Sequence, residues 1–248
     1  MEVHKHPHHV THKKKWSEYL LEFFMLFLAV FLGFVAENVR ENSVENHREK
    51  QYIISMLEDL KSDTAQLNHS INFRKVWRNK MDSLSRYLQS PDIAQHGKEI
   101  YYNAKSISRG FRFLSNDRTI QQLKNAGNLR LIHNQLVSDS IMQYDQNVRR
   151  ILYHSEMLTQ LKYENRHLAG KLFNAAVLEE LEFNRTDEFP TSKTNPPLLI
   201  MDSILINEFL VDLLTLKKID SSNQNAEESL CRIAVALMNL IKKEYHLD

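Results

Sequence analysis

Five histidines crowd the start of the chain, and imidazole is a side chain well suited to capture a transition metal. Neutral histidines at this spacing predict a site for zinc, copper or nickel. Two other interpretations stay open, namely a tail that lies at a membrane surface and an expression tag. The candidate metal ligands are His4, His6, His8, His9 and His12.

Glu22 lies immediately before the uninterrupted apolar run, residues 23–36. Ionisable groups in a membrane segment can line an ion or proton pathway when several helices assemble around them. A glutamate close to the membrane interface can also reach water by extending its side chain along the helix. Glu22 therefore marks either the membrane edge or a passage in an oligomeric channel or proton-coupled assembly.

The other reactive residues show no catalytic spacing. The single cysteine, Cys231, falls among apolar positions of an amphipathic helix, where we expect a buried, inert thiol. The sequence contains no glycine-rich phosphate loop and no HExxH, GxSxG or CxxC motif. We therefore expect no enzyme activity and no cofactor, apart from a metal ion at the histidine-rich tail.

The apolar stretch around Glu22 spans a membrane only when its flank is included. The uninterrupted run, residues 23–36, would make a helix of about 21 Å, which is shorter than the roughly 30 Å hydrocarbon core. Extension back to Trp16 gives about 31 Å and makes Trp16 and Tyr19 interfacial aromatic anchors. The sequence predicts a transmembrane helix over residues 16–36.

A cleaved signal peptide is the alternative, because Lys13, Lys14 and Lys15 precede the apolar stretch. Cleavage after Ala36 would put the bulky Phe34 where a small residue is required, which favours a retained anchor. The three lysines also place the N-terminus in the cytoplasm by the positive-inside rule. We expect a cytoplasmic tail followed by a single crossing, with the rest of the chain outside the cytoplasm.

Composition favours an all-α protein. The 248 residues include only five glycines and five prolines, which is too few for a loop-rich fold. The 32 basic and 31 acidic residues are spread along the chain. Because no basic stripe appears, we expect no nucleic-acid partner.

Apolar periodicity divides the chain after the membrane segment. A polar helix is expected at first, and apolar positions at helical spacing return at Ile53 and continue to Gln89, before Ser90 and Pro91. Further helices are predicted over 98–113 and 118–125, and a very long one from Asn134 packs antiparallel to the first. The predicted segments are a His/Lys-rich tail (1–15), the transmembrane helix (16–36), a polar juxtamembrane helix (37–52) and a helical bundle (53–182).

The C-terminal part is predicted to be a helical hairpin over residues 198–248. Residues 183–197 contain the prolines and polar residues of an exposed loop. Residues 198–218 and 226–245 then have helical patterns on either side of the polar sequence IDSSNQN. Acidic residues inside the first of these helices argue against a second membrane crossing.

Three stretches of the chain carry a resemblance to a known family. KKKWSEYLLEFFMLFLAVFLGFVAENVRE (13–41), REKQYIISMLEDLKSDT (48–64) and IQQLKNAGNLRLIHNQLVSDSIMQYD (120–145) resemble an uncharacterised family of bacterial single-pass membrane proteins with a domain of unknown function. The histidine-rich start is similar too. The resemblance implies a location in the bacterial cytoplasmic membrane and implies no activity.

The expected function is that of a membrane-anchored helical interaction protein, as a scaffold or a sensor-like subunit. Its partners would be the lipid bilayer and another protein or a second copy of the chain. An oligomeric channel or proton-coupled assembly around Glu22, and a metal-responsive role of the histidine tail, are the alternatives.

Overall fold

The computed structural model describes residues 15–108, 110, 112–125, 127–183 and 195–247. Every regular element in these ranges is a helix, which confirms the predicted all-α class. The chain divides into two units, residues 1–50 and residues 51–248. The five candidate metal ligands of the tail and most of the predicted loop 183–197 lie outside the described residues.

The first unit contains the apolar start of helix α1 (Trp16–Leu88). Among the described residues, α1 is the one helix with a stretch long and apolar enough to cross a membrane. The apolar side chains of this stretch are uncovered, with Trp16 86% and Phe34 73% exposed. The helix ends at Leu88, as predicted from Ser90 and Pro91, which follow it.

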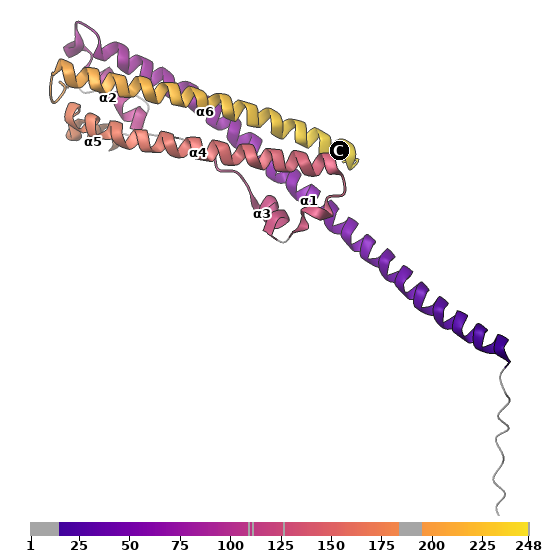
Figure 1. Cartoon of the computed structure of the whole chain (residues 1–248). Coiled ribbons are helices and arrows are strands. Elements are labelled where there is room, and N and C mark those ends of the chain that lie inside the picture. Colours follow the sequence, from indigo (N-terminus) through magenta and orange to yellow (C-terminus); the bar gives the residue numbers. More distant parts are fainter. Residues whose placement is uncertain (1–14, 109, 111, 126, 184–194, 248) are drawn as a thin grey trace, which may run out of the picture. The chain divides into compact units, whose positions relative to one another are not determined.

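The second unit is a helical bundle (Figure 1). Its long members are the later part of α1, α4 (Gln135–Leu172) and α6 (Ser203–Glu244). The shorter elements are η1 (Ile93–Gln95), α2 (Gly97–Ser108), α3 (Arg118–Asn125), η2 (Asn128–Leu131) and α5 (Ala175–Phe183). Helix α3 has the bounds that the sequence predicted, whereas α2 ends earlier than expected.

Helix α4 runs parallel to α1, so the predicted antiparallel packing of these two helices is wrong. Tyr144 near the start of α4 bonds to Asp63, and Lys162 farther along α4 lies over Trp77, farther along α1. The reason is the long connection through α2 and α3, which returns the chain along α1 before α4 begins. Helix α6 is antiparallel to both, as Figure 1 shows.

Helix α6 is continuous, so the predicted C-terminal hairpin is also wrong. The polar sequence expected to form its turn, 219–225, lies within the helix. Asp220 and Asn223 are 0% and 2% exposed there, and Asp220 and Gln224 accept hydrogen bonds from arginines of α1. Partners in another helix thus satisfy polar side chains that would otherwise favour a turn.

The predicted long helix from Asn134 is interrupted after Leu172. Asn134 caps α4 by accepting the Val137 amide at 3.2 Å, but Phe173 has extended backbone angles and α5 begins two residues later. The Asn174 amide donates to the Tyr101 hydroxyl at 2.8 Å, and that hydroxyl donates to the Pro197 carbonyl at 3.0 Å. These hydrogen bonds fix the segment between α4 and α5 to α2.

Two aspartates of α1 hold the segment that leads into α3. Asp63 accepts hydrogen bonds from the Tyr144 hydroxyl at 2.6 Å, the Ser115 hydroxyl at 2.7 Å and the Asn116 amide at 2.7 Å. Asp59, one turn earlier, accepts the Thr119 amide at 3.0 Å. Because these carboxylates bind donors at the start of α3, they act as caps supplied by another helix.

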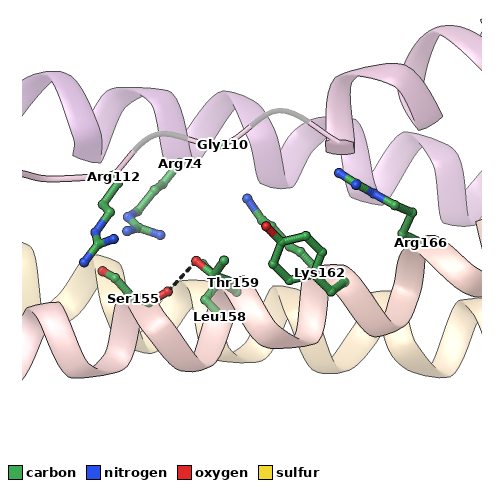
Figure 2. A pocket seen from close by; sticks show the side chains of 9 residues that line it. Arg74, Gly110, Arg112, Ser155, Leu158, Thr159, Lys162 and Arg166 are labelled. Atoms are coloured by element: carbon green, nitrogen blue, oxygen red, sulfur yellow. Dashed lines mark hydrogen bonds between the residues drawn. The ribbon is translucent and has the colours of Figure 1, made fainter.

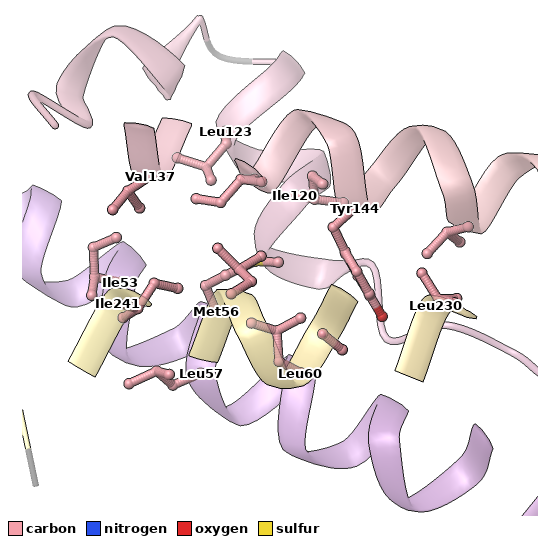
Figure 3. Packing of buried hydrophobic residues seen from close by; sticks show 14 of the residues in the cluster. Ile53, Met56, Leu57, Leu60, Ile120, Leu123, Val137, Tyr144, Leu230 and Ile241 are labelled. Atoms are coloured by element: carbon pink, nitrogen blue, oxygen red, sulfur yellow. The ribbon is translucent and has the colours of Figure 1, made fainter. Parts of the chain in front are cut away.

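A polar layer divides the interior of the bundle into two apolar clusters. The first cluster joins the part of α1 after residue 50 to α3, the first half of α4 and the end of α6 (Figure 3), with Ile53, Leu60, Leu123, Val137, Ile141, Leu230 and Ile241 among its members. The second contains Trp77, Met81, Leu84, Ile100, Tyr101, Leu172, Phe173, Phe209 and Leu213. Along both α1 and α6, buried polar residues separate the positions of one cluster from those of the other. These residues, which form the polar layer, are Ser70, Arg74, Asp220, Asn223, Gln224 and Glu227.

Candidate functional site

The polar layer is built around Arg74 of α1, which is 3% exposed. Its guanidinium donates to both carboxylate oxygens of Glu227, from Nε at 3.0 Å and from Nη2 at 2.8 Å, and it also bonds to Asp220. The Ser70 hydroxyl donates to Glu227 at 2.8 Å. Arg78, one turn after Arg74, bonds to Asp220 at 3.3 Å and to Gln224.

These contacts hold three charged side chains, Arg74, Asp220 and Glu227, in the interior of the bundle. Burial by itself disfavours the Arg74 cation, but the hydrogen bonds and charges of Glu227 and Asp220 outweigh it and raise the pKa of Arg74. Burial also raises the pKa of Asp220, against the opposing pull of Arg74 and Arg78. Such a network is stable when complete and is costly when one member is missing.

Arg74 also lines a pocket of about 220 Å³. One face of α4 supplies most of the wall, and residues 110 and 112 supply another part (Figure 2). The wall contains four cationic side chains and three hydroxyl groups. The lining residues are Arg74, Gly110, Arg112, Ser155, Leu158, Thr159, Lys162, Tyr163 and Arg166.

Lys162 is the half-buried cation of this wall, and its ammonium lies 4.1 Å from the centre of the Trp77 ring. Burial lowers the pKa of Lys162 to about 8, the Asp220 carboxylate opposes this shift, and the Arg74 cation adds to it. A lysine that lines a pocket and whose charged form is disfavoured by burial is a candidate functional residue.

Ser155 brings an unsatisfied hydroxyl to the same pocket. The residue is 6% exposed, and its Oγ has no hydrogen-bond partner among the described residues. The Thr159 hydroxyl donates to the Ser155 carbonyl oxygen at 2.9 Å, which is the dashed bond in Figure 2. A buried hydroxyl without a partner costs free energy, so a ligand oxygen at this place would be favoured.

Replacing Lys162 with methionine is expected to stabilise the protein at neutral pH. The full shift in pKa corresponds to about 3 kcal/mol, and the partial exposure of the side chain reduces the expected gain to about 2 kcal/mol. Because unfolding takes up a proton between pH 8 and 10.5, wild-type stability rises with pH in that window. The advantage of Lys162→Met should therefore shrink toward pH 10.

This prediction is checked by thermal unfolding of both proteins in a non-ionic detergent between pH 7 and pH 10. Cys231, Tyr101 and Tyr144, whose pKa values are raised by burial, contribute equally to both proteins. The difference in stability between the two proteins therefore reports the titration of Lys162. Lys171→Met, an exposed change on the same helix, is the matched control. A pH-independent difference would show that the Lys162 charge carries no cost in the fold.

The described residues among the sites predicted from the sequence lie outside this pocket. Glu22, Trp16 and Tyr19 are exposed positions of the first unit. Cys231 is half-buried in α6, with its sulfur 3.9 Å from Asn68 Oδ1, and burial raises the pKa of its thiol. Among the described residues, no three histidine, cysteine, aspartate or glutamate side chains are grouped as a metal would require.

The pocket was not predicted from the sequence, although two signals for it exist there. Ser155, Thr159, Lys162 and Arg166 recur at helical spacing and therefore share one face of α4. Asp220 and Glu227 occupy the inner register of α6, in phase with its buried apolar positions. Polar residues in phase with a core indicate partners on a facing helix, which here are Arg74 and Arg78.

No protein-family model, curated protein or solved structure matches the chain. The family resemblance therefore stays a prediction.

Proposed function

We propose that the chain is a membrane-anchored interaction protein, as a scaffold or a sensor-like subunit. Residues 16–36 cross the bacterial cytoplasmic membrane once, the N-terminal tail stays in the cytoplasm, and the helical unit lies outside. The observation that carries this proposal is the uncovered apolar surface of the first unit, where Phe23 is 67% and Phe34 73% exposed. A run of large apolar side chains needs lipid or protein to cover it.

A second apolar surface, in the helical unit, supports an interaction role. Ile204, Val211 and Leu214 of α6 are 71%, 54% and 67% exposed, and their spacing puts them on one face of the helix. Three apolar residues just before α6 are exposed as well, and we define the apolar surface as Leu199, Ile200, Met201, Ile204, Val211 and Leu214. Exposed apolar groups gathered in this way are typical of protein contacts.

Photo-crosslinking in native membranes tests the proposal. A crosslinking amino acid at Val211 of the full chain is expected to give one defined product, either with a partner protein or with a second copy. The same amino acid at Arg150, an exposed polar position of α4, is the matched control and should give none. A variant without residues 16–36 is expected to leave the membrane fraction and to lose the product.

The proposal fails in two recognisable ways. If the shortened variant stays in the membrane fraction, residues 16–36 are not the anchor. If Val211 and Arg150 give the same products, or neither gives any, the apolar surface of α6 is not a binding surface.

A further inference from the structure

We propose that the pocket between α4, Arg74 and residues 110 and 112 binds a small oxyanion with two negative charges, for which inorganic phosphate is the simplest probe. This inference goes beyond the interaction role and does not depend on it. Its first basis is the convergence of four cationic side chains from three parts of the helical unit. They are Arg74 of α1, Arg112 before α3, and Lys162 and Arg166 of α4.

The nearby carboxylates do not fill the pocket. Asp220 and Glu227 bond to the inner arginines from the α6 side, so Arg74 has a fixed position behind the cavity. Glu156 approaches Arg112 only at 3.8 Å, and both side chains are more than half exposed. Such an exposed pair is weak and can open when a ligand competes for the arginine.

The other two cations of the wall, Lys162 and Arg166, lie against aromatic rings. The Lys162 ammonium lies over the Trp77 ring, and the Arg166 guanidinium lies 5.4 Å from the centre of the Tyr163 ring. Ring contacts of this kind help to fix the position of a cation. Guanidinium groups bind the oxygens of phosphate or carboxylate in pairs, and a lysine adds a point charge.

The second and independent basis is Ser155. Ser155 lines the pocket, and its buried Oγ lacks a hydrogen-bond partner among the described residues. A rotation about the Cα–Cβ bond lets this hydroxyl donate to a ligand oxygen. A carboxylate or phosphate oxygen would therefore satisfy a group that the fold leaves unsatisfied. The same contact gives the site a neutral donor, whose loss can be measured without a change in charge.

The size of the pocket restricts the ligand. Its volume of about 220 Å³ lies below the roughly 300 Å³ at which sites for drug-sized molecules begin. This space accommodates a phosphate ion or a small phosphorylated molecule. A lipid headgroup offers the same chemistry, so the experiment must separate a free oxyanion from a headgroup.

Isothermal titration of the full chain in nanodiscs of phosphatidylcholine, at constant ionic strength, is the direct test. Inorganic phosphate is expected to bind saturably, and Ser155→Ala and Lys162→Met are each expected to weaken binding about tenfold. Lys171→Met, with the same change of charge on the same helix, should bind like the wild type. Lys162→Met is expected to be the more stable protein, so misfolding would not explain its loss of affinity.

A second arm uses nanodiscs that contain phosphatidic acid. If a headgroup occupies the pocket, the apparent affinity for added phosphate falls in these discs for the wild type, and if the ligand is a free oxyanion it does not change. Both results support the site. The proposal is overturned if inorganic phosphate shows no saturable binding, or if Lys171→Met loses as much affinity as Lys162→Met. No partner protein is present, so this failure is independent of the interaction role.

Discussion

Replacing Arg74 with methionine is expected to destabilise the helical unit by about 3–5 kcal/mol, since it leaves the Asp220 and Glu227 carboxylates buried without their main partner. Both acidic side chains are 0% exposed. For a unit of this size the loss lowers the melting temperature by roughly 10 °C. Thermal unfolding in phosphate-free neutral detergent, followed by the emission of the buried Trp77, measures the effect.

Compensating changes distinguish a missing partner from a simple cavity. Arg74→Met combined with Asp220→Leu and Glu227→Met removes the three fully buried charges together and leaves Arg78, which is partly exposed. This variant is expected to recover most of the lost stability. Arg74→Lys keeps the charge but not the paired hydrogen bonds to Glu227, so an intermediate loss is expected. Arg150→Met, at an exposed arginine of α4, should change stability by less than about 0.5 kcal/mol. Equal effects at Arg74 and Arg150 would contradict the assigned role of the network.

Asp63→Ala is expected to cost about 3 kcal/mol, because three donors lose one buried acceptor. Asp63 is 0% exposed and binds the Tyr144 and Ser115 hydroxyls and the Asn116 amide. Hydrogen exchange of the α3 amides should accelerate more than that of α6, since Asp63 holds the entry to α3. Chemical denaturation and hydrogen exchange of the full chain give the two readouts.

Two comparisons make the Asp63 result specific. Tyr144→Phe removes one donor and leaves the carboxylate with two, so a loss of about 1 kcal/mol is expected. Asp139→Ala removes an exposed aspartate of α4 that accepts only a surface bond from Gln135, and little change is expected. If Asp63→Ala leaves both the free energy of unfolding and the hydrogen exchange of the α3 amides unchanged, the aspartate does not hold that segment.

The ends of α1 and α3 were predictable because nearby residues determine them. Ser90 and Pro91 end α1, and a polar segment followed by Gly127 and Asn128 marks the bounds of α3. The all-α class was predictable for the same reason. Apolar residues spaced three and four apart indicate a helix from its own sequence alone, without knowledge of its neighbours.

Features that depend on another helix were not predictable in this way. The sequence IDSSNQN has the composition of a turn, and only Arg74 and Arg78, well over a hundred residues away, make Asp220 and Gln224 acceptable inside a helix. The parallel course of α4 follows from where α2 and α3 lead the chain. The pocket depends on the buried position of Arg74 and on the parallel course of α4, because residues of α4 and Arg74 line it together.

The ionic layer also acts as a register mark for the long helices. Arg74 lies between Asp220 and Glu227, which are two turns apart on α6. If α6 slid by one heptad along α1, Arg74 would lie between Glu227 and Ala234, or between Leu213 and Asp220, and would lose one of its two carboxylates. Apolar faces tolerate such sliding because leucines are interchangeable, whereas a buried charge does not. The layer thus selects one alignment among several that an apolar bundle would accept.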